Sequence, residues 1–355
     1  MNPVRYGVIG AGVIANYMVP AFTPGGGSVA VAVADVNPEA ANKIAAATGA
    51  GRIYADYRDL LTDADVDAVY IATPPYLHRP ICLAALDAGK HVCCEKPFAL
   101  TQAEVREVIA ARAGKPHLKV TCNSSRFHCS GTARRAREII GAGDLGEVYR
   151  VHFEHITGAS KPGTTLPAWR NDPARNGGGI SFDWGPYDLD WLSFVLGRLF
   201  RPRVVFGTLG NYFPLTEQRV PPCLDVDGRL CAEIICDGGL TIHWERRAAE
   251  HGPARHGIEI RGRQGGLDLA FVPMGQKQQL HHYAYQGVEE LVETVLPDEV
   301  PNWNDTMIHS IRDLTTAIQN GTEPCHTLED DLRIHGVLDA LHTSAREQRA
   351  VRLSD

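Results

Sequence analysis

The sequence lacks the cysteine pattern of a disulfide-bonded protein or a zinc ribbon. Its nine cysteines are an odd number in a chain of 355 residues, and no two of them form a C-x-x-C pair. A disulfide framework and a zinc ribbon are therefore disfavoured. We expect the cysteines to be small buried hydrophobic residues, as free cysteines usually are. They are Cys82, Cys93, Cys94, Cys122, Cys129, Cys223, Cys231, Cys236 and Cys325.

Long apolar runs and basic runs are also missing. No segment has the roughly 18 uninterrupted apolar residues of a membrane span, and the start MNPVRYGVIGAG does not have the pattern of a signal peptide. The 35 lysines and arginines are scattered and are outnumbered by 42 acidic residues. We therefore expect a cytoplasmic protein with neither a membrane nor a nucleic acid as its partner.

What remains is an ordinary globular composition, with 44% hydrophobic and 22% charged residues. These values are close to the averages for soluble proteins and argue against disorder, collagen and coiled coil. The length corresponds to two domains at about 100 to 200 residues each.

Residues 5–123 alternate short β-branched runs with amphipathic segments of helix length, which predicts a doubly wound parallel sheet covered by helices. Helix signals lie between the runs: Asn37-Pro38 and the capping box Thr101-Gln-Ala-Glu104 open helices, and Gly89 closes one. The predicted strands are Tyr6–Ile9, Val29–Ala34, Asp67–Ala72, His91–Cys94 and Leu118–Cys122, with a weaker one at Arg52–Tyr54.

A glycine-rich turn, Gly10-Ala-Gly12-Val13-Ile14-Ala15, follows the first strand and precedes a helix. This G-x-G-x-x-A pattern is typical of a Rossmann dinucleotide-binding turn, in which the glycines let a pyrophosphate approach the backbone near Val13 and Ile14. The alternative is a glycine turn that binds nothing.

Asp35 stands at the end of the second predicted strand, where an acid can accept hydrogen bonds from the adenosine ribose. The next residues, Val36 and Asn37, offer no cation for a 2′-phosphate. The local charge therefore favours NAD over NADP, although an exposed turn aspartate would also explain the residue type.

Two further strand ends lead to the same edge of the sheet, because ligands of open parallel sheets bind beyond the carboxyl ends of the strands. One is followed by Thr73, Pro74 and His78, and the other by Glu95 and Lys96. We expect all five at the cofactor. Lys96 is the first catalytic candidate, because burying an ammonium is costly unless it is paired or takes part in chemistry. A solvated turn lysine is the alternative.

From Glu147 onward the apolar residues alternate at period two, which predicts an open, mainly antiparallel sheet with one face covered. We therefore expect a Rossmann domain at 1–123 and an α+β domain at 124–355. The predicted strands are Val148–Glu154, Arg203–Tyr212, Leu230–Cys236, Leu240–Arg246, Gly257–Arg261 and Leu267–Val272.

A loop at Gly158–Asn176 leads into three glycines, 177–179, and then a helix. Asp183, Tyr187 and Asp190 are spaced to share one helix face, although Pro186 requires an irregular first turn. The alternative is a helix that begins only at Pro186. A tyrosine in this position suits proton exchange with an alcohol oxygen. Alternatively, Tyr187 belongs to an aromatic core stripe with two neighbouring tryptophans.

Together, these motifs resemble the glucose-fructose oxidoreductase, inositol dehydrogenase and MocA (Gfo/Idh/MocA) family over essentially the whole chain. The resemblance implies a nicotinamide cofactor and redox chemistry at a carbinol carbon of a polyhydroxylated sugar or cyclitol. It implies that Lys96 is catalytic, that Asp183 is the helix aspartate that orients Lys96 or binds a substrate hydroxyl, and that Asn123, Trp169 and Arg170 line the cleft.

One departure concerns Tyr187, because inositol dehydrogenases have a histidine there. A tyrosine resembles the glucose-fructose oxidoreductase and dihydrodiol dehydrogenase branch, in which its hydroxyl is the acid or base. Those relatives often use NADP, whereas Asp35 favours NAD. We expect substrate specificity to lie in the 158–176 loop and around Arg126.

The leading hypothesis is an NAD(P)-dependent dehydrogenase or ketoreductase, with Tyr187 exchanging the proton and Lys96 stabilising the oxyanion. A redox glycosidase and a non-catalytic dinucleotide sensor are the alternatives. We also expect a homodimer or homotetramer, because an open sheet face needs covering. No metal is expected: His128, His281 and His282 have no ligand spacing and are interpreted as surface or cleft residues.

Overall fold

The computed structural model describes residues 2–22, 27–158, 167–211, 226–250, 252–270, 279–286, 290–297 and 303–353. They form two compact units, residues 1–126 with 304–332 and residues 127–303 with 333–355. The first unit thus includes a segment from late in the sequence. The domain boundary expected at residue 123 remains a prediction.

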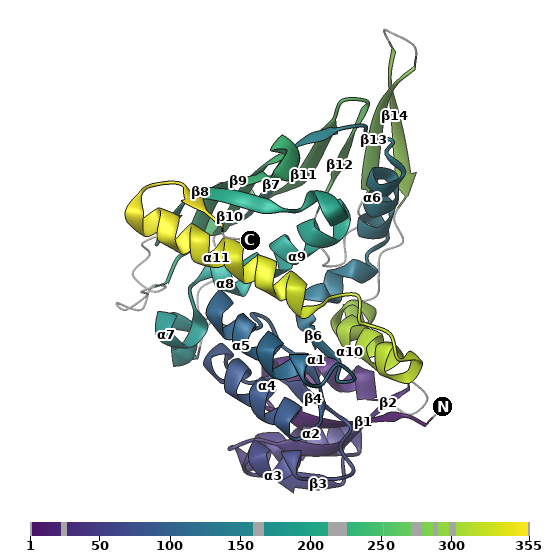
Figure 1. Cartoon of the computed structure of the whole chain (residues 1–355), viewed down its shortest axis with the longest axis vertical. Coiled ribbons are helices and arrows are strands. Elements are labelled where there is room, and N and C mark those ends of the chain that lie inside the picture. Colours follow the sequence, from purple (N-terminus) through teal and green to yellow (C-terminus); the bar gives the residue numbers. More distant parts are fainter. Residues whose placement is uncertain are drawn as a thin grey trace. The chain divides into compact units, whose positions relative to one another are not determined.

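The first unit contains a six-stranded, entirely parallel sheet in the order β3-β2-β1-β4-β5-β6 (Figure 1). Its strands are β1 Val4–Ile9, β2 Ser28–Ala34, β3 Arg52–Tyr54, β4 Ala68–Ile71, β5 His91–Cys94 and β6 Val120–Cys122. The crossover segments contain α1 Val13–Met18, α2 Pro38–Thr48, α3 Tyr57–Leu61, α4 His78–Asp87 and α5 Gln102–Ala113. This is the predicted doubly wound Rossmann fold, and the near-continuous burial of β4 and β5 reflects helices on both faces.

The predicted helix signals are confirmed in the side-chain contacts. Asn37 Oδ1 accepts a hydrogen bond from the Glu39 amide at 3.0 Å, directly before Pro38 at the start of α2. Thr101 Oγ1 accepts one from the Glu104 amide at 3.2 Å. The Glu104 carboxylate reaches back to the Leu100 amide at 2.8 Å, one residue earlier than in the standard capping box.

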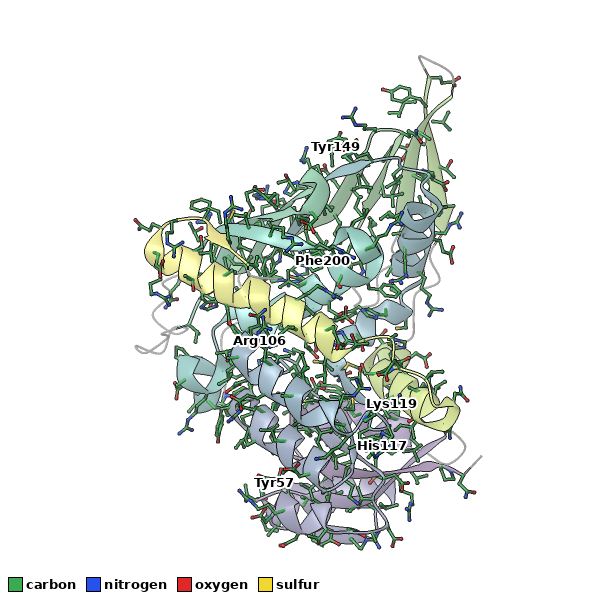
Figure 2. All side chains as sticks on the ribbon, in the orientation of Figure 1. Tyr57, Arg106, His117, Lys119, Tyr149 and Phe200 are labelled. Atoms are coloured by element: carbon green, nitrogen blue, oxygen red, sulfur yellow. The ribbon has the colours of Figure 1, made fainter. Side chains whose placement is uncertain are left out.

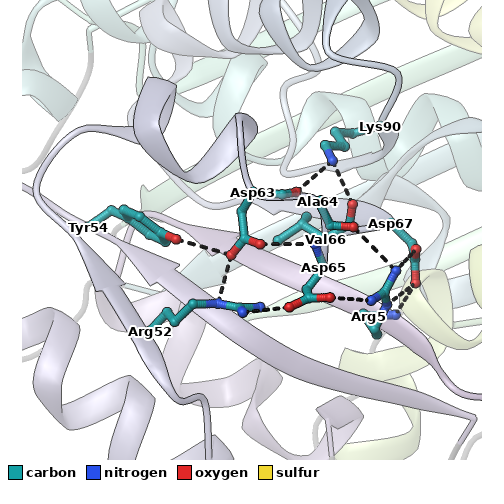
Figure 3. A network of polar contacts seen from close by, with 9 residues as sticks. All are labelled: Arg5, Arg52, Tyr54, Asp63, Ala64, Asp65, Val66, Asp67 and Lys90. Carbon is teal, nitrogen blue, oxygen red and sulfur yellow. Dashed lines mark hydrogen bonds and ion pairs between the residues drawn. The ribbon is translucent and has the colours of Figure 1, made fainter.

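Charged side chains tie the amino ends of the strands together (Figure 3). Arg5 on β1 donates to the Asp67 carboxylate before β4 and to Asp65. Lys90, just before β5, donates from Nζ to the backbone carbonyls of Asp63 and Val66 at 2.8 and 2.7 Å. Ligands of such sheets bind at the carboxyl ends of the strands. This network lies at the opposite, amino ends of the strands, so we assign it a structural role: it holds the connection between α3 and β4 in place.

The second unit contains a nine-stranded sheet in the order β14-β13-β12-β11-β7-β10-β9-β8-β15. All its strand pairs are antiparallel except β7 with β10, as the period-two pattern predicts for an open, mostly antiparallel sheet. Its strands are β7 Val148–Gly158, β8 Pro202–Gly210, β9 Arg229–Cys236, β10 Thr241–Glu250, β11 Arg255–Gly262, β12 Gly265–Leu269, β13 Gln279–Gln286, β14 Glu290–Pro297 and β15 Val351–Arg352.

One face of this sheet carries the core. Phe200 is buried there, whereas Tyr149 near the start of β7 is exposed (Figure 2). The helices outside the six-stranded sheet's crossovers are α6 Gly131–Ala142, α7 Pro173–Asn176, α8 Ile180–Asp183, α9 Gly185–Leu196, α10 Trp303–Asn320 and α11 Leu328–Glu347. The predicted strand ends Tyr212 and Val272 and residues 159–166 of the 158–176 loop lie outside the described residues.

The eight described cysteines are free, as expected, and Cys223 lies outside the described residues. Their expected burial holds for Cys82, Cys93, Cys94, Cys122 and Cys236, whereas Cys325 is exposed. In the part of the chain that the structure describes, no helix is long and apolar enough to cross a membrane.

Candidate active site

The strands of the parallel sheet end in register, so the residues that follow them share one edge. Ile9 pairs with Ile71, and Ile71 pairs with Cys94. Cys94 in turn pairs with Cys122. The sequence-predicted residues Gly10, Asp35, Thr73, Glu95 and Asn123 directly follow these strands or lie one residue beyond. The fold therefore brings them to a single edge, as the sequence predicted.

The turn between β1 and α1 is shaped by its two glycines. Gly10 has a φ of +93°, and a Cβ on it would lie 2.7 Å from the backbone carbonyl of Ala72. At Gly12 the situation is reversed: no described atom lies within 4 Å of the place of a Cβ. Val13, the first residue of α1, is exposed. The turn is therefore closed on the sheet side and open where a ligand would meet the backbone.

Asp35 connects the second strand end to this turn. Its Oδ2 accepts a hydrogen bond from the Ala11 amide at 2.6 Å, and its Oδ1 accepts one from the Asn37 amide at 2.7 Å. The carboxylate is half-buried. Each oxygen keeps further acceptor capacity, since an ionised carboxylate offers about four lone-pair positions.

His78 joins the turn after β4 to the turn after β5. Its ring nitrogens lie 2.7 Å from the Pro97 carbonyl and 2.8 Å from the Thr73 carbonyl, and the side chain is fully buried. Thr73 Oγ1 is buried without a hydrogen-bond partner among the described residues. The histidine thus braces the two turns, while Thr73 retains an unused polar atom.

Glu95 is the centre of a buried polar network in the first unit. Its carboxylate accepts hydrogen bonds from the Tyr70 hydroxyl at 2.7 Å, from the Asn123 amide, and from the Arg126 guanidinium at 3.1 Å. Burial raises the pKa of Glu95, but the Arg126 charge and these hydrogen bonds outweigh it, so the pKa lies below its ordinary value. An ionised carboxylate is therefore held inside the protein next to Lys96.

Lys96 and Arg126 differ in their surroundings. Lys96 is half-buried, its amide contacts Glu95 Oε2 at 3.2 Å, and its peptide bond to Pro97 is cis. Arg126, predicted to be a substrate residue, is only 5% exposed and also donates to the Asn123 carbonyl at 3.2 Å. The structure places Arg126 as the counter-charge of Glu95.

In the second unit, the three glycines fit around a residue that the sequence analysis missed. A Cβ on Gly179 would lie 1.8 Å from the carbonyl oxygen of Asp227. The Asp227 carboxylate accepts hydrogen bonds from the amides of Gly179 and Ser181, each at 2.8 Å, and from the Ser181 hydroxyl at 2.9 Å. Gly179 is thus required because the backbone of Asp227 packs directly against it, and the Asp227 carboxylate caps the start of α8.

The segment from Asp183 to Asp190 forms parts of two helices. Asp183 ends α8, and α9 begins at Gly185 with Pro186 in its first turn. This confirms the irregular start at Pro186. It also means that Asp183 does not share a helix with Tyr187 and Asp190, because the proline ring cannot continue an α-helix from the preceding turn.

Among the predicted substrate residues of this unit, Arg170 contacts Asp183 and Trp169. An Arg170 guanidinium nitrogen lies 3.5 Å from Asp183 Oδ1, and the guanidinium stacks on the Trp169 ring at 5.5 Å. The Tyr187 ring is buried, with the Trp184 ring centre 5.5 Å away and Phe127 edge-on at 5.1 Å. Tyr187 therefore belongs to an aromatic cluster that contains Trp184, one of the two tryptophans of the alternative interpretation, together with Phe127.

A buried ion pair next to Tyr187 was not predicted. Asp188 Oδ2 accepts hydrogen bonds from Trp244 Nε1 at 2.9 Å and from Arg246 Nε at 2.6 Å, and Asp188 Oδ1 accepts a further one from Arg246. The Arg246 guanidinium also lies 4.8 Å above the Trp184 ring. This pair connects the start of α9 to β10. The sequence analysis predicted a strand ending at Arg246 but not that the partner of Arg246 is Asp188.

The three histidines expected at the surface or in the cleft differ in location. His128 is buried, stacks on Phe194 with ring centres 4.1 Å apart, and lies 3.1 Å from the Asp190 carboxylate. His128 is therefore not a surface residue, because it and its partner Asp190 are both buried. His281 pairs with Glu293 at 2.6 Å and His282 is half-buried.

Comparison with known proteins relates both units to one family. The oxidoreductase family with an NAD-binding Rossmann fold matches residues 4–123, and its GFO/IDH/MocA C-terminal domain matches residues 133–268. A solved oxidoreductase domain protein from Kribbella flavida is 26% identical over the whole of both chains, with a TM-score of 0.87.

Two curated relatives are named for sugar chemistry. The 1,5-anhydro-D-fructose reductase of Ensifer adhaerens is 36% identical over 54% of this chain and 56% of its own length. The levoglucosan dehydrogenase of Pseudarthrobacter phenanthrenivorans is 26% identical over 89% of this chain and 87% of its own. With both family domains matched in order, this chain belongs to the GFO/IDH/MocA family of NAD(P)-dependent oxidoreductases.

Proposed function

We propose that this protein transfers a hydride between NAD and a secondary alcohol or ketone carbon of a sugar, sugar derivative or cyclitol. The observation that carries the proposal is the shared strand edge of the first unit, where an open glycine turn, the Asp35 carboxylate and Lys96 meet. The two curated relatives act, by their names, on small polyhydroxylated compounds. This supports the substrate class without identifying the sugar.

The residues at this edge fit a dinucleotide in three respects. Open space at Gly12 admits a pyrophosphate to the start of α1 near Val13 and Ile14. Asp35 has acceptor capacity for ribose hydroxyls. The buried Thr73 Oγ1 and Asn123 Oδ1 have no hydrogen-bond partner among the described residues. Such orphaned atoms are costly unless a ligand or water satisfies them. We propose that Pro74, His78 and Glu95 shape the turns that surround the dinucleotide.

The bound nicotinamide supplies or accepts the hydride, and the protein's own residues handle the proton and the charge. Tyr187 exchanges a proton with the reacting hydroxyl, and the Lys96 ammonium stabilises the negative charge that develops on that oxygen. Asp183, in contact with Arg170, accepts a hydrogen bond from a substrate hydroxyl. Trp169 offers an apolar ring face of the kind that packs against sugar carbons.

The activity is tested with a panel of sugars, polyols and inososes, by following the absorbance of reduced nicotinamide. We expect at least one compound to reduce NAD, or to oxidise NADH, in repeated turnovers. Measurable NADH binding with no absorbance change across the panel would instead indicate a dinucleotide sensor. Release of nitrophenol from a nitrophenyl glycoside without net consumption of NAD would indicate a redox glycosidase.

Cofactor preference is tested by Asp35→Asn. The carboxylate repels a 2′-phosphate and accepts charge-assisted hydrogen bonds from the ribose, so its loss should lower the NAD-to-NADP ratio of kcat/KM by about 10- to 100-fold. The control is Asp56→Asn, because Asp56 also follows a strand and accepts a hydrogen bond from a helix amide, that of Arg58 at 2.8 Å. An unchanged ratio in Asp35→Asn would refute the assignment.

We also propose that the uncovered face of the nine-stranded sheet forms a homo-oligomer. By register, Phe206 and Ile235 lie on the face opposite the core, as do Tyr285, Leu291 and Val295. Each of these five side chains is exposed in the single chain. Apolar groups at both ends of an open sheet are the kind of surface that a second subunit covers.

This predicts a dimer or tetramer in sedimentation at micromolar concentration. The double variant Phe206→Glu with Ile235→Glu should shift the population towards monomer, because it places carboxylates in an apolar contact. Val36→Glu serves as the control, since Val36 is exposed in the first unit and lies on no sheet face. A monomeric parent protein would contradict the proposal.

A further inference from the structure

Three side chains with metal-binding atoms meet inside the first unit. They are Cys122 at the end of β6, His326 in the connection between α10 and α11, and Asp331 in the first turn of α11. Their ligand atoms all lie within 4.8 Å of one another, and His326 Nε2 lies 3.0 Å from Asp331 Oδ2. Each of the three residues is at most 1% exposed.

The backbone holds these residues in place independently of their side chains. Thr121 Oγ1 donates a hydrogen bond to the His326 carbonyl at 3.0 Å, which fixes the connection against β6. Asp330 accepts hydrogen bonds from the Thr327 amide and hydroxyl at 3.0 and 2.8 Å and so defines the start of α11. The three metal-binding atoms are therefore brought together by backbone segments whose positions other residues already fix.

The surroundings of the cluster are apolar. Cys122 belongs to the same apolar core as Val120 and Leu328. A buried carboxylate is stable only where a positive charge or hydrogen bonds compensate for its lost hydration. A divalent cation bound by one thiolate, one carboxylate and one neutral imidazole gives a site with no net charge, which suits an apolar interior.

We propose that Cys122, His326 and Asp331 bind one Zn²⁺ ion. Sulfur, imidazole nitrogen and carboxylate oxygen are the three ligand types of zinc in proteins, and harder cations such as Mg²⁺ or Ca²⁺ do not favour a thiolate. Bond lengths of about 2.0 to 2.3 Å place tetrahedral ligand atoms about 3.3 to 3.8 Å apart, within the spacing of this cluster. A neutral fourth ligand such as water completes the tetrahedron.

The site has a structural role. The ion fastens the α10–α11 connection to the end of β6, and the residue after Cys122 is Asn123, which contacts Glu95. Zinc binding therefore stabilises the strand end that supports the Glu95 network. It is separate from hydride transfer and does not depend on the proposed function.

The test uses the full chain without an affinity tag. After incubation with Zn²⁺ and extensive dialysis, elemental analysis should give one zinc per chain, with a dissociation constant below about 1 µM. Co²⁺ in its place should show tetrahedral visible bands and a thiolate charge-transfer band. A parent protein that retains no zinc would overturn the proposal and leave the cluster as a buried ion pair beside a thiol.

Variants locate the ion. Cys122→Ser, His326→Gln and Asp331→Asn should each weaken zinc binding by about a hundred-fold or more, and Cys122→Ser should remove the thiolate band. Cys93→Ala is the matched control, because Cys93 is an equally buried strand cysteine outside the cluster. Zinc retained by all three ligand variants, or lost equally from Cys93→Ala, would overturn the assignment. Circular dichroism of each variant shows whether zinc is lost because a ligand is missing or because the variant is misfolded. If a variant does not fold, the number of zinc ions bound per chain of the parent protein tests the proposal.

Discussion

Replacing Tyr187 by phenylalanine should lower turnover by about two to four orders of magnitude while binding of the dinucleotide survives. The substitution removes only the hydroxyl that we assign to proton exchange. The ring remains among Trp184 and Phe127, so the aromatic cluster is preserved. The measurement is steady-state kinetics on the substrate found in the panel, with NADH affinity determined by fluorescence.

A matched control for this variant is Tyr6→Phe. Tyr6 is also a buried tyrosine, and its hydroxyl lies 3.0 Å from Thr315 Oγ1, so the control loses a buried hydrogen bond without touching the proposed chemistry. Turnover should stay within about a factor of a few in Tyr6→Phe, since one neutral hydrogen bond mainly affects stability. Near-normal turnover in Tyr187→Phe would leave the tyrosine as a core residue only.

Asp188→Ala should lower the free energy of unfolding of the second unit by about 3 to 5 kcal/mol. The change strands the Arg246 guanidinium, which is 1% exposed, as an unpaired buried charge, and it also removes the acceptor of Trp244 Nε1. Because Asp188 adjoins Tyr187 on α9, activity should fall together with stability. Urea unfolding followed by tryptophan fluorescence measures the effect.

The chain provides a closely matched comparison in Asp237→Ala. Asp237 also forms an ion pair through both carboxylate oxygens, with Arg203 at 2.6 and 2.9 Å. The side chains of Asp237 and Arg203 are, however, each about two-fifths exposed. Exposed pairs contribute about 0 to 1 kcal/mol, so this variant should be nearly neutral. Equal losses in the two variants would show that burial of the Asp188–Arg246 pair has no special role.

Elements with a regular local signal were predicted from the sequence. The five main strands of the first unit appear within one or two residues of their predicted ranges, because buried parallel strands are short, continuous apolar runs between strong helix caps. The glycine turn and its partner Asp35 were also recognisable from local sequence, because each occupies a fixed place relative to the end of a strand. Their contact through the Ala11 amide follows from that placement.

Other elements had no such signal. β13 and β14 were not predicted, and their sequences mix histidine, tyrosine and glutamate on the outer face. Asp183 and Tyr187 lie on two helices, because Pro186 begins a new helix and the Ile180 amide at the start of α8 is held by the distant Asp227 carbonyl. The periodicity of apolar residues describes one segment at a time, so it cannot reveal a partner that is distant in the sequence.

The sequence by itself determined the class of the fold, the sheet edge at which we propose that a dinucleotide binds, and the residue types present at that edge. Local spacing is sufficient for these, since each depends on a strand, a turn and the residue that follows. Only the tertiary structure decided which charges are buried together. Asp227 packs against Gly179, Asp188 pairs with Arg246, and Cys122 lies beside His326 and Asp331; each of these contacts joins segments that are far apart in the chain. The free energy that selects such contacts comes from burial, which exists only once the distant segments have packed.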